Sequence, residues 1–167
     1  MGDRHDRHRL VVLRHAKAGE LPGGPDFERV LVPSGQRDSA AAGSWLASHG
    51  FRPDTVICSS SRRTLQTWEN AAPALGGDPE FHAEERLYDA GVEDLVEIIR
   101  QTPPEVGTLL YIGHNPAAAK FASMVTGRET ALPSSPSTAV IALDGDWADL
   151  AAGTGELEAT WSPKAED

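Results

Sequence analysis

Arginine and histidine side chains stand at or soon after the ends of three apolar runs. Arg14 and His15 close the run 10–13, while Arg63 and His114 follow two later runs. Guanidinium groups offer planar, paired donors that match phosphate oxygens, and an imidazole nitrogen is a competent nucleophile. If folding brings these four side chains together, the sequence predicts a site that grips a phosphoryl group and attacks it with a histidine.

Apolar runs alternate with segments of helical periodicity along the chain. The expected strands are 10–13, 55–58, 108–112, 137–143 and an edge strand at 157–161, and the expected helices are Ser34 (as N-cap) to 49, 62–75, 92–100 and 116–125. This alternation predicts an α/β fold with three layers, in which helices cover both faces of a mainly parallel sheet. Because ligands bind at the carboxyl ends of the strands in such sheets, the candidate side chains should meet at that edge.

The length and composition indicate one domain. The chain has 167 residues, of which 40% are hydrophobic, and this suits a single globular domain over 9–162. We expect a disordered lead-in over 1–8 and a short tail over 163–167. Among the large apolar side chains, Trp45, Trp68, Phe81 and Leu87 are core candidates.

The charge and cysteine content narrow the classes of partner. A net charge of −10 argues against nucleic acid, whose binding needs a basic face. No apolar run approaches the roughly 20 residues that a bilayer span requires, so we expect no membrane partner. Cys58 is the only cysteine and lies in an apolar run, which predicts an inert buried thiol. These features together suggest a cytoplasmic protein, and they say nothing about oligomeric state.

Neither a nucleotide nor a metal is expected as a cofactor. The chain has no Gly-rich Walker loop and no Asp-x-Asp pair that could hold magnesium. Histidine attack on phosphorus needs no metal, provided that fixed cations stabilise the transferring group.

Three motifs resemble those of one known family. Leu13-Arg14-His15-Ala16 is similar to the signature of the histidine phosphatase superfamily, which includes the phosphoglycerate mutases. Residues 59–67 (SSSRRTLQT) resemble its second motif and place the motif arginine at Arg63, while Gly113-His-Asn-Pro116 resembles the motif with the second histidine. All three occur in the family's order, and the resemblance covers residues 9–143.

The resemblance implies a fold and a set of roles. His15 would be the nucleophile, while Arg14, Arg63 and His114 would hold the phosphoryl oxygens. The short chain and the Ala16 that follows the histidine look like the SixA-type phosphohistidine phosphatase branch. The phosphoglycerate mutase-like fold is then expected, without a large cap between the second motif and residue 90.

Other site residues are less well defined by the motifs. Superfamily members often carry a proton-donating Glu after a leucine, and Leu87-Tyr-Asp89 resembles that pattern with Asp89 in its place; Glu84 and Glu85 are nearby alternatives. Ser59 could contact the phosphate or serve as a structural hydroxyl, and Arg62 is expected at the surface.

Several functions remain open at this stage. The first is a metal-independent phosphatase that works through a phosphohistidine on His15, with a protein phosphohistidine as substrate. A small-molecule phosphomonoesterase of the same superfamily is the alternative. A mutase fits less well, because it must shield its phosphoenzyme from water. A non-catalytic phosphate-binding or scaffold protein is the competing class.

Overall fold

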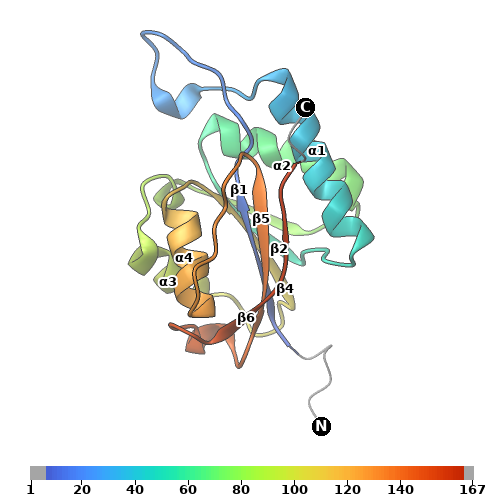
Figure 1. The fold of residues 1–167 in the computed structure, drawn as a ribbon, viewed down its shortest axis with the longest axis vertical. Coiled ribbons are helices and arrows are strands. Elements are labelled where there is room, and N and C mark those ends of the chain that lie inside the picture. The colour runs from blue at the N-terminus through green and yellow to red at the C-terminus, as the bar shows by residue number, and fades with distance from the viewer. Residues whose placement is uncertain (1–6, 164–167) are drawn as a thin grey trace.

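The protein is described here by a computed structural model over residues 7–163. Six strands form one sheet with two helices on each face (Figure 1). The strands are β1 (Arg9–Arg14), β2 (Thr55–Ser59), β3 (Glu80–Glu84), β4 (Thr108–Gly113), β5 (Ser137–Leu143) and β6 (Gly155–Trp161). The helices are α1 (Pro33–Ser48), α2 (Arg62–Leu75), α3 (Val92–Arg100) and α4 (Ala117–Thr126).

The sheet is mixed, and its order along the sheet is β3-β2-β4-β1-β5-β6. The pairings of β3 with β2, β2 with β4 and β4 with β1 are parallel, whereas β5 and β6 join by antiparallel pairings. The predicted three-layer α/β class is therefore confirmed, with an antiparallel extension at one edge. The order places β4 between β1 and β2, which the sequence did not indicate.

Strand β1 shows why both faces of the sheet are covered. Leu10 and Val12 belong to the core beneath α3 and α4, while Val11 and Leu13 belong to the core beneath α1 and α2. All four side chains are fully buried, as expected for a strand between two helical layers. Helices α1 and α2 approach closely at Gly43, where an added Cβ would collide with the backbone of α2.

Two elements differ from the sequence prediction. The edge strand β3 was missed, because its five residues are mostly exposed and polar and show no apolar run. Phe81 lies on this strand and is 38% exposed, so its assignment to the core was wrong, whereas Leu87 is buried as predicted. Helix α1 begins at Pro33 after Val32 as N-cap, so Ser34 lies inside the helix and does not cap it.

The two ends of the chain fall partly outside the described residues, which exclude 1–6 and 164–167. Arg7 and His8, which we expected in a disordered lead-in, pack against the domain. The backbone carbonyl of His8 accepts a hydrogen bond from the N–H of Leu143, and the side chain of Arg7 forms an ion pair with Asp144 at 2.9 Å. Within residues 7–163, no helix combines the length and the apolarity needed to cross a membrane.

Candidate active site

The strand register places the two candidate histidines side by side. Arg14 on β1 pairs with Gly113 on the parallel strand β4, so the residues that follow them, His15 and His114, lie next to each other. Their ring centroids are 5.2 Å apart, in an edge-to-face arrangement. Strand β2 pairs with the other side of β4 and brings Ser59 to the same edge. The carboxyl ends of three neighbouring strands therefore build one site, as expected for this fold class.

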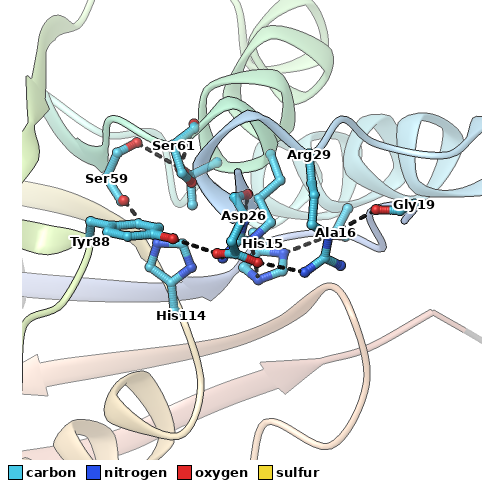
Figure 2. A network of polar contacts seen from close by, with 11 residues as sticks. His15, Ala16, Gly19, Asp26, Arg29, Ser59, Ser61, Tyr88 and His114 are labelled. Carbon is cyan, nitrogen blue, oxygen red and sulfur yellow. Dashed lines mark hydrogen bonds and ion pairs between the residues drawn. The ribbon is translucent and has the colours of Figure 1, made fainter. Parts of the chain in front are cut away.

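The ring of His15 is held in a defined orientation. Its Nδ1 lies 2.7 Å from the carbonyl oxygen of Ala16 (Figure 2). Its Nε2 lies 3.3 Å from Nε of Arg63. A carbonyl can only accept, so Nδ1 carries the proton and Nε2 presents a lone pair. Burial, more than the nearby charge of Arg63, lowers the pKa of His15 to about 4, although the hydrogen bond to Ala16 opposes this shift. The ring is therefore neutral at neutral pH, and Nε2 is its unprotonated nitrogen.

The turn after β1 is pinned to helix α2. The backbone N–H of Ala16 donates to the hydroxyl of Thr67 at 3.0 Å, and this hydroxyl donates to the carbonyl oxygen of Arg63 at 2.8 Å. Ala16 is fully buried, so a small side chain is required here. This contact fixes His15 relative to the first turn of α2, where Arg63 lies.

Arg63 is a buried cation with its guanidinium facing the ring of His15. Its side chain is only 9% exposed, and its NH2 pairs with the carboxylate of Asp26 at 2.9 Å. Its NH1 donates to the backbone carbonyl of Asp26 at the same distance. Two of the five guanidinium N–H groups remain for a ligand beyond these contacts and the bond to His15.

His114 and Arg14 complete the set that the motifs predicted. Nε2 of His114 lies 2.8 Å from the hydroxyl of Ser59, and NH1 of Arg14 donates to the carbonyl of Leu132 at 2.9 Å. Burial first, then the charges of His15 and Arg63, lowers the pKa of His114 to about 3. Nδ1 of His114 and Nε of Arg14 are buried without a hydrogen-bond partner among residues 7–163. We call Arg14, His15, Arg63 and His114 the floor.

The sequence did not predict a second group of side chains above the floor. The carboxylate of Asp26 accepts hydrogen bonds from Arg29 at 2.8 Å, from Arg63, and from the hydroxyl of Tyr88 (Figure 2). Tyr88 also packs edge-on against His114, with ring centroids 5.6 Å apart. We call Asp26, Arg29 and Tyr88 the rim. The available signal was an acidic and a basic residue three positions apart, in and after the Gly/Pro-rich loop that follows β1.

Hydrogen bonds within the rim shift the pKa values of Asp26 and Tyr88 in opposite directions. The hydrogen bond from Tyr88, followed by the one from Arg29, holds the pKa of Asp26 well below its usual range. The same bond raises the pKa of Tyr88. Asp26 is therefore an ionised carboxylate at neutral pH and Tyr88 is a neutral phenol.

The remaining predicted residues lie at the margin of the site. Asp89 is exposed and lines a groove of about 420 Å³ with Tyr88, His114 and Lys120. Arg62 is exposed as expected. Ser59 is fully buried and contacts His114, so it reaches a ligand only if that hydroxyl turns. Residues 7–163 contain no group of three or more His, Cys, Asp or Glu that could hold a metal ion.

Comparison with known proteins agrees with this geometry. The profile of the histidine phosphatase superfamily (branch 1) matches residues 10–118, which include β1, α2 and the start of α4. The chain belongs to this superfamily. An uncharacterised protein of Mycobacterium tuberculosis is 32% identical to this histidine phosphatase over 155 residues, covering 87% of the chain and 96% of the relative.

Solved structures place this histidine phosphatase in the SixA-type branch. A structure from Nakamurella multipartitia, assigned as a phosphohistidine phosphatase SixA, superposes with a TM-score of 0.83 at 30% identity, covering 95% of this chain and 98% of that one. One from Agrobacterium tumefaciens with the same assignment gives 0.81 at 25% identity, with coverage of 93% and 98%. The predicted superfamily, branch and phosphatase class are thereby confirmed. The roles of individual residues stay predictions.

Proposed function

We propose that this protein hydrolyses the phosphohistidine of a protein substrate, without a metal, through a phosphohistidine formed on His15. The observation that carries the proposal is the orientation of the His15 ring. Its Nδ1 proton is tied to the carbonyl of Ala16, and its Nε2 lone pair faces the buried guanidinium of Arg63. A neutral imidazole aimed at a fixed cation is what attack on a phosphoryl group requires.

The first step transfers the phosphoryl group. Nε2 of His15 forms a bond to phosphorus while the bond from phosphorus to the substrate's imidazole nitrogen breaks. The bonding electrons go to that nitrogen, and a substrate ring already protonated on its other nitrogen leaves as a neutral imidazole. Arg14, Arg63 and His114 hold the phosphoryl oxygens during transfer.

The second step returns His15 to its starting form. Phosphorylated on Nε2 and protonated on Nδ1, the ring carries a positive charge that the carbonyl of Ala16 stabilises through the existing hydrogen bond. Water attacks phosphorus, the bond to Nε2 breaks, and its electron pair returns to Nε2 while the water proton passes to solvent. No proton has to move on His15 itself, so the same tautomer starts the next cycle.

The accessible site supports a macromolecular substrate. The connection from the carboxyl end of β3 to α3 is only residues 85–91, so no large insertion lies there to cover the site. The groove beside His114 extends the floor toward Tyr88, Asp89 and Lys120 and could hold residues next to the phosphorylated side chain. An imidazole leaving group needs little acid assistance, which suits a floor without a protonated carboxyl.

The small-molecule phosphomonoesterase remains the second candidate because Asp89 lines the same groove as His114. An alkoxide leaving group needs a general acid, and Asp89 is the predicted donor. Replacing Asp89 by Asn separates the two functions. Loss of ester hydrolysis with retained phosphohistidine hydrolysis supports Asp89 as a donor for esters only.

Turnover and its dependence on His15 test the proposed function. The wild type should hydrolyse an aryl phosphate in the presence of a chelator, and His15→Ala should not. A rapid alkaline quench should trap a phosphoenzyme in the wild type alone, and subsequent treatment with acid should hydrolyse it. Phosphate binding without turnover would instead favour the scaffold function.

A competition experiment tests the substrate class. A phosphorylated histidine-containing protein is compared with sugar and nucleotide phosphates by kcat/KM. The phosphoprotein should rank first. A small ester that ranks first by orders of magnitude would replace the protein substrate with the second candidate.

A further inference from the structure

The carboxylate of Asp26 lies directly beside the cation that is expected to receive the phosphoryl group. One of its oxygens accepts both Arg63 NH2, at 2.9 Å, and the Tyr88 hydroxyl, and the other accepts Arg29 NH1 at 2.8 Å. Figure 2 shows this carboxylate between Tyr88 and the ring of His15. A negative charge therefore lies at the edge of a site that is proposed to bind an anion.

This placement is built into the fold. The loop that carries Asp26 is closed at its base by the bridge between Ala18 and Leu31 and by the bond from Gly19 N–H to the carbonyl of Val30. Leu31 N–H also donates to the side chain of Gln66 on α2 at 2.8 Å. The loop is therefore anchored to the helix that supplies Arg63.

The inside of the loop is braced as well. Nε of Arg29 donates to the carbonyl of Gly19 at 2.8 Å, so the cation that holds Asp26 is itself fixed. Phe27 packs against the ring of Tyr88, with centroids 5.0 Å apart. Asp26 is 49% exposed but is held by three donors. A carboxylate on an exposed loop would otherwise turn toward water.

The charges of the floor and the rim together match one phosphoryl group. Arg14, Arg29 and Arg63 contribute three positive charges, Asp26 contributes one negative charge, and His15 is neutral, as is His114. The sum of two positive charges matches a phosphoryl group, which carries about −1.5 to −2 at neutral pH. A second negative group on the Asp26 side of the ligand would meet this carboxylate, and the two cations there, Arg29 and Arg63, are already paired with it. Lys120, the exposed cation of the groove, lies beside His114 instead.

We propose that Asp26 is a specificity-determining residue that rejects ligands with a second negative charge next to the phosphoryl group. It favours a phosphoryl group carried by a neutral or cationic side chain, such as histidine, and disfavours compact phosphorylated acids. Specificity of this kind comes from a repulsive element aimed at the wrong ligand. The preference for a histidine carrier rests on the proposed function, whereas the rejection of a second charge requires only that the floor binds a phosphoryl group.

A matched ligand pair tests the proposal without turnover. Phenylphosphonate and 3-carboxyphenylphosphonate differ by one carboxylate, and their dissociation constants are measured by calorimetry. The wild type should bind the carboxylated compound more weakly. In Asp26→Asn the ratio of the two constants should shift toward the carboxylated compound by about tenfold, as expected for removing one nearby like charge.

Glu28→Gln is the matched control. Glu28 lies in the same short helical turn as Asp26, is exposed, and forms no side-chain hydrogen bond or ion pair with the described residues. The substitution changes the net charge equally, so the ratio should stay within about twofold of the wild-type value. An equal shift in both variants would show a general effect of net charge and would overturn the proposal.

A second variant covers the case in which Asp26→Asn does not fold. Asp26→Ala also removes the carboxylate, so the ratio should shift in the same direction and by a similar factor. An unchanged ratio in every folded variant overturns the proposal, as does an equal loss of affinity for both phosphonates, which would mean that Asp26 only orients Arg63.

A failure of the proposed role of Asp26 can be distinguished from a failure of the proposed phosphatase function. If the phosphonates bind with the expected selectivity but no substrate is turned over, the charge filter stands and the phosphatase function fails. If the enzyme hydrolyses aryl phosphate through His15 but Asp26→Asn leaves the ratio unchanged, only the filter fails. If the wild type binds neither phosphonate, the floor is not an anion site and both are overturned.

Discussion

The floor and the rim of the site are built by different parts of the molecule. Floor residues end or follow strands β1 and β4, where backbone pairing sets their relative positions, or lie in the first turn of α2. Rim residues come from the loop after β1 and the segment before α3, and side-chain hydrogen bonds hold them. The difference suggests a division of labour in which the floor carries the chemistry and the rim selects the ligand.

The two regions also tune their ionisable groups in different ways. On the floor, burial is the main cause that lowers the pKa of both His15 and His114. On the rim, hydrogen bonds from Tyr88 and Arg29 lower the pKa of an exposed carboxylate. Floor ionisation therefore depends on the core, and rim ionisation depends on a few contacts that a single substitution removes.

The largest effect should come from removing His15, the proposed nucleophile. His15→Ala should lower kcat for aryl phosphate hydrolysis by on the order of 10⁴-fold or more, because no other group can form the covalent intermediate. His49→Ala, an exposed histidine on the C-cap of α1, serves as control and should retain activity. A His15 variant with wild-type kcat would end the assignment of chemistry to the floor.

Replacing the buried cation should have the next largest effect. Arg63→Lys keeps the charge but loses the fork that contacts both His15 and the ligand, so kcat/KM should fall by about 10²-fold. Arg62→Lys makes the same change at the exposed neighbouring position and should alter kcat/KM by less than about twofold. Equal losses in the two variants would contradict the distinct placement of Arg63.

The protonation of His15 should follow its burial. NMR titration of the ring in the free enzyme should give a pKa of about 4, below the value of about 6.5 found in model peptides. An unfolded chain takes up this proton near pH 6.5, so the free energy of unfolding should fall as pH drops from 6.5 toward 4. Urea denaturation across this range should show a steeper fall for the wild type than for His15→Ala. A measured pKa of His15 near 6.5 would contradict the argument that burial lowers this pKa.

The smallest effect should come from the hydroxyl that supports the second histidine. Ser59→Ala removes the contact with Nε2 of His114, and a loss of about 1 kcal/mol corresponds to a roughly fivefold fall in kcat/KM. Ser60→Ala is the control, because the hydroxyl of Ser60 has no hydrogen-bond partner within residues 7–163. A loss above about 100-fold in Ser59→Ala would mean that Ser59 contacts the substrate directly.

The floor was predictable because its residues are tied to strand ends. A run such as Leu10–Leu13 identifies a buried strand, and the residue after such a strand lies at the ligand-binding edge. Strand order was not predictable, because several orders satisfy the same hydrophobic pattern. That β4 lies between β1 and β2, and so brings His114 to His15, depends on long-range packing.

The rim and the sheet edge were missed for a related reason. Asp26 and Tyr88 are 62 positions apart and meet only through side-chain contacts, which leave no periodic signal. Strand β3 pairs with β2 through its backbone, while its residues face largely toward solvent. Phe81 was consequently assigned to the core on hydrophobicity alone, although it packs against the partly buried Trp68 near the surface.

The pairing of Arg14 with Gly113 has a consequence for how the site can be lost. A shift of β1 by one position against β4 would send His15 to the opposite face of the sheet, and His114 would lose its neighbouring imidazole. Any chain that assembles its central strands correctly has therefore already aligned its two imidazoles. Misassembly in this protein should yield inert molecules, and partially active ones should be rare.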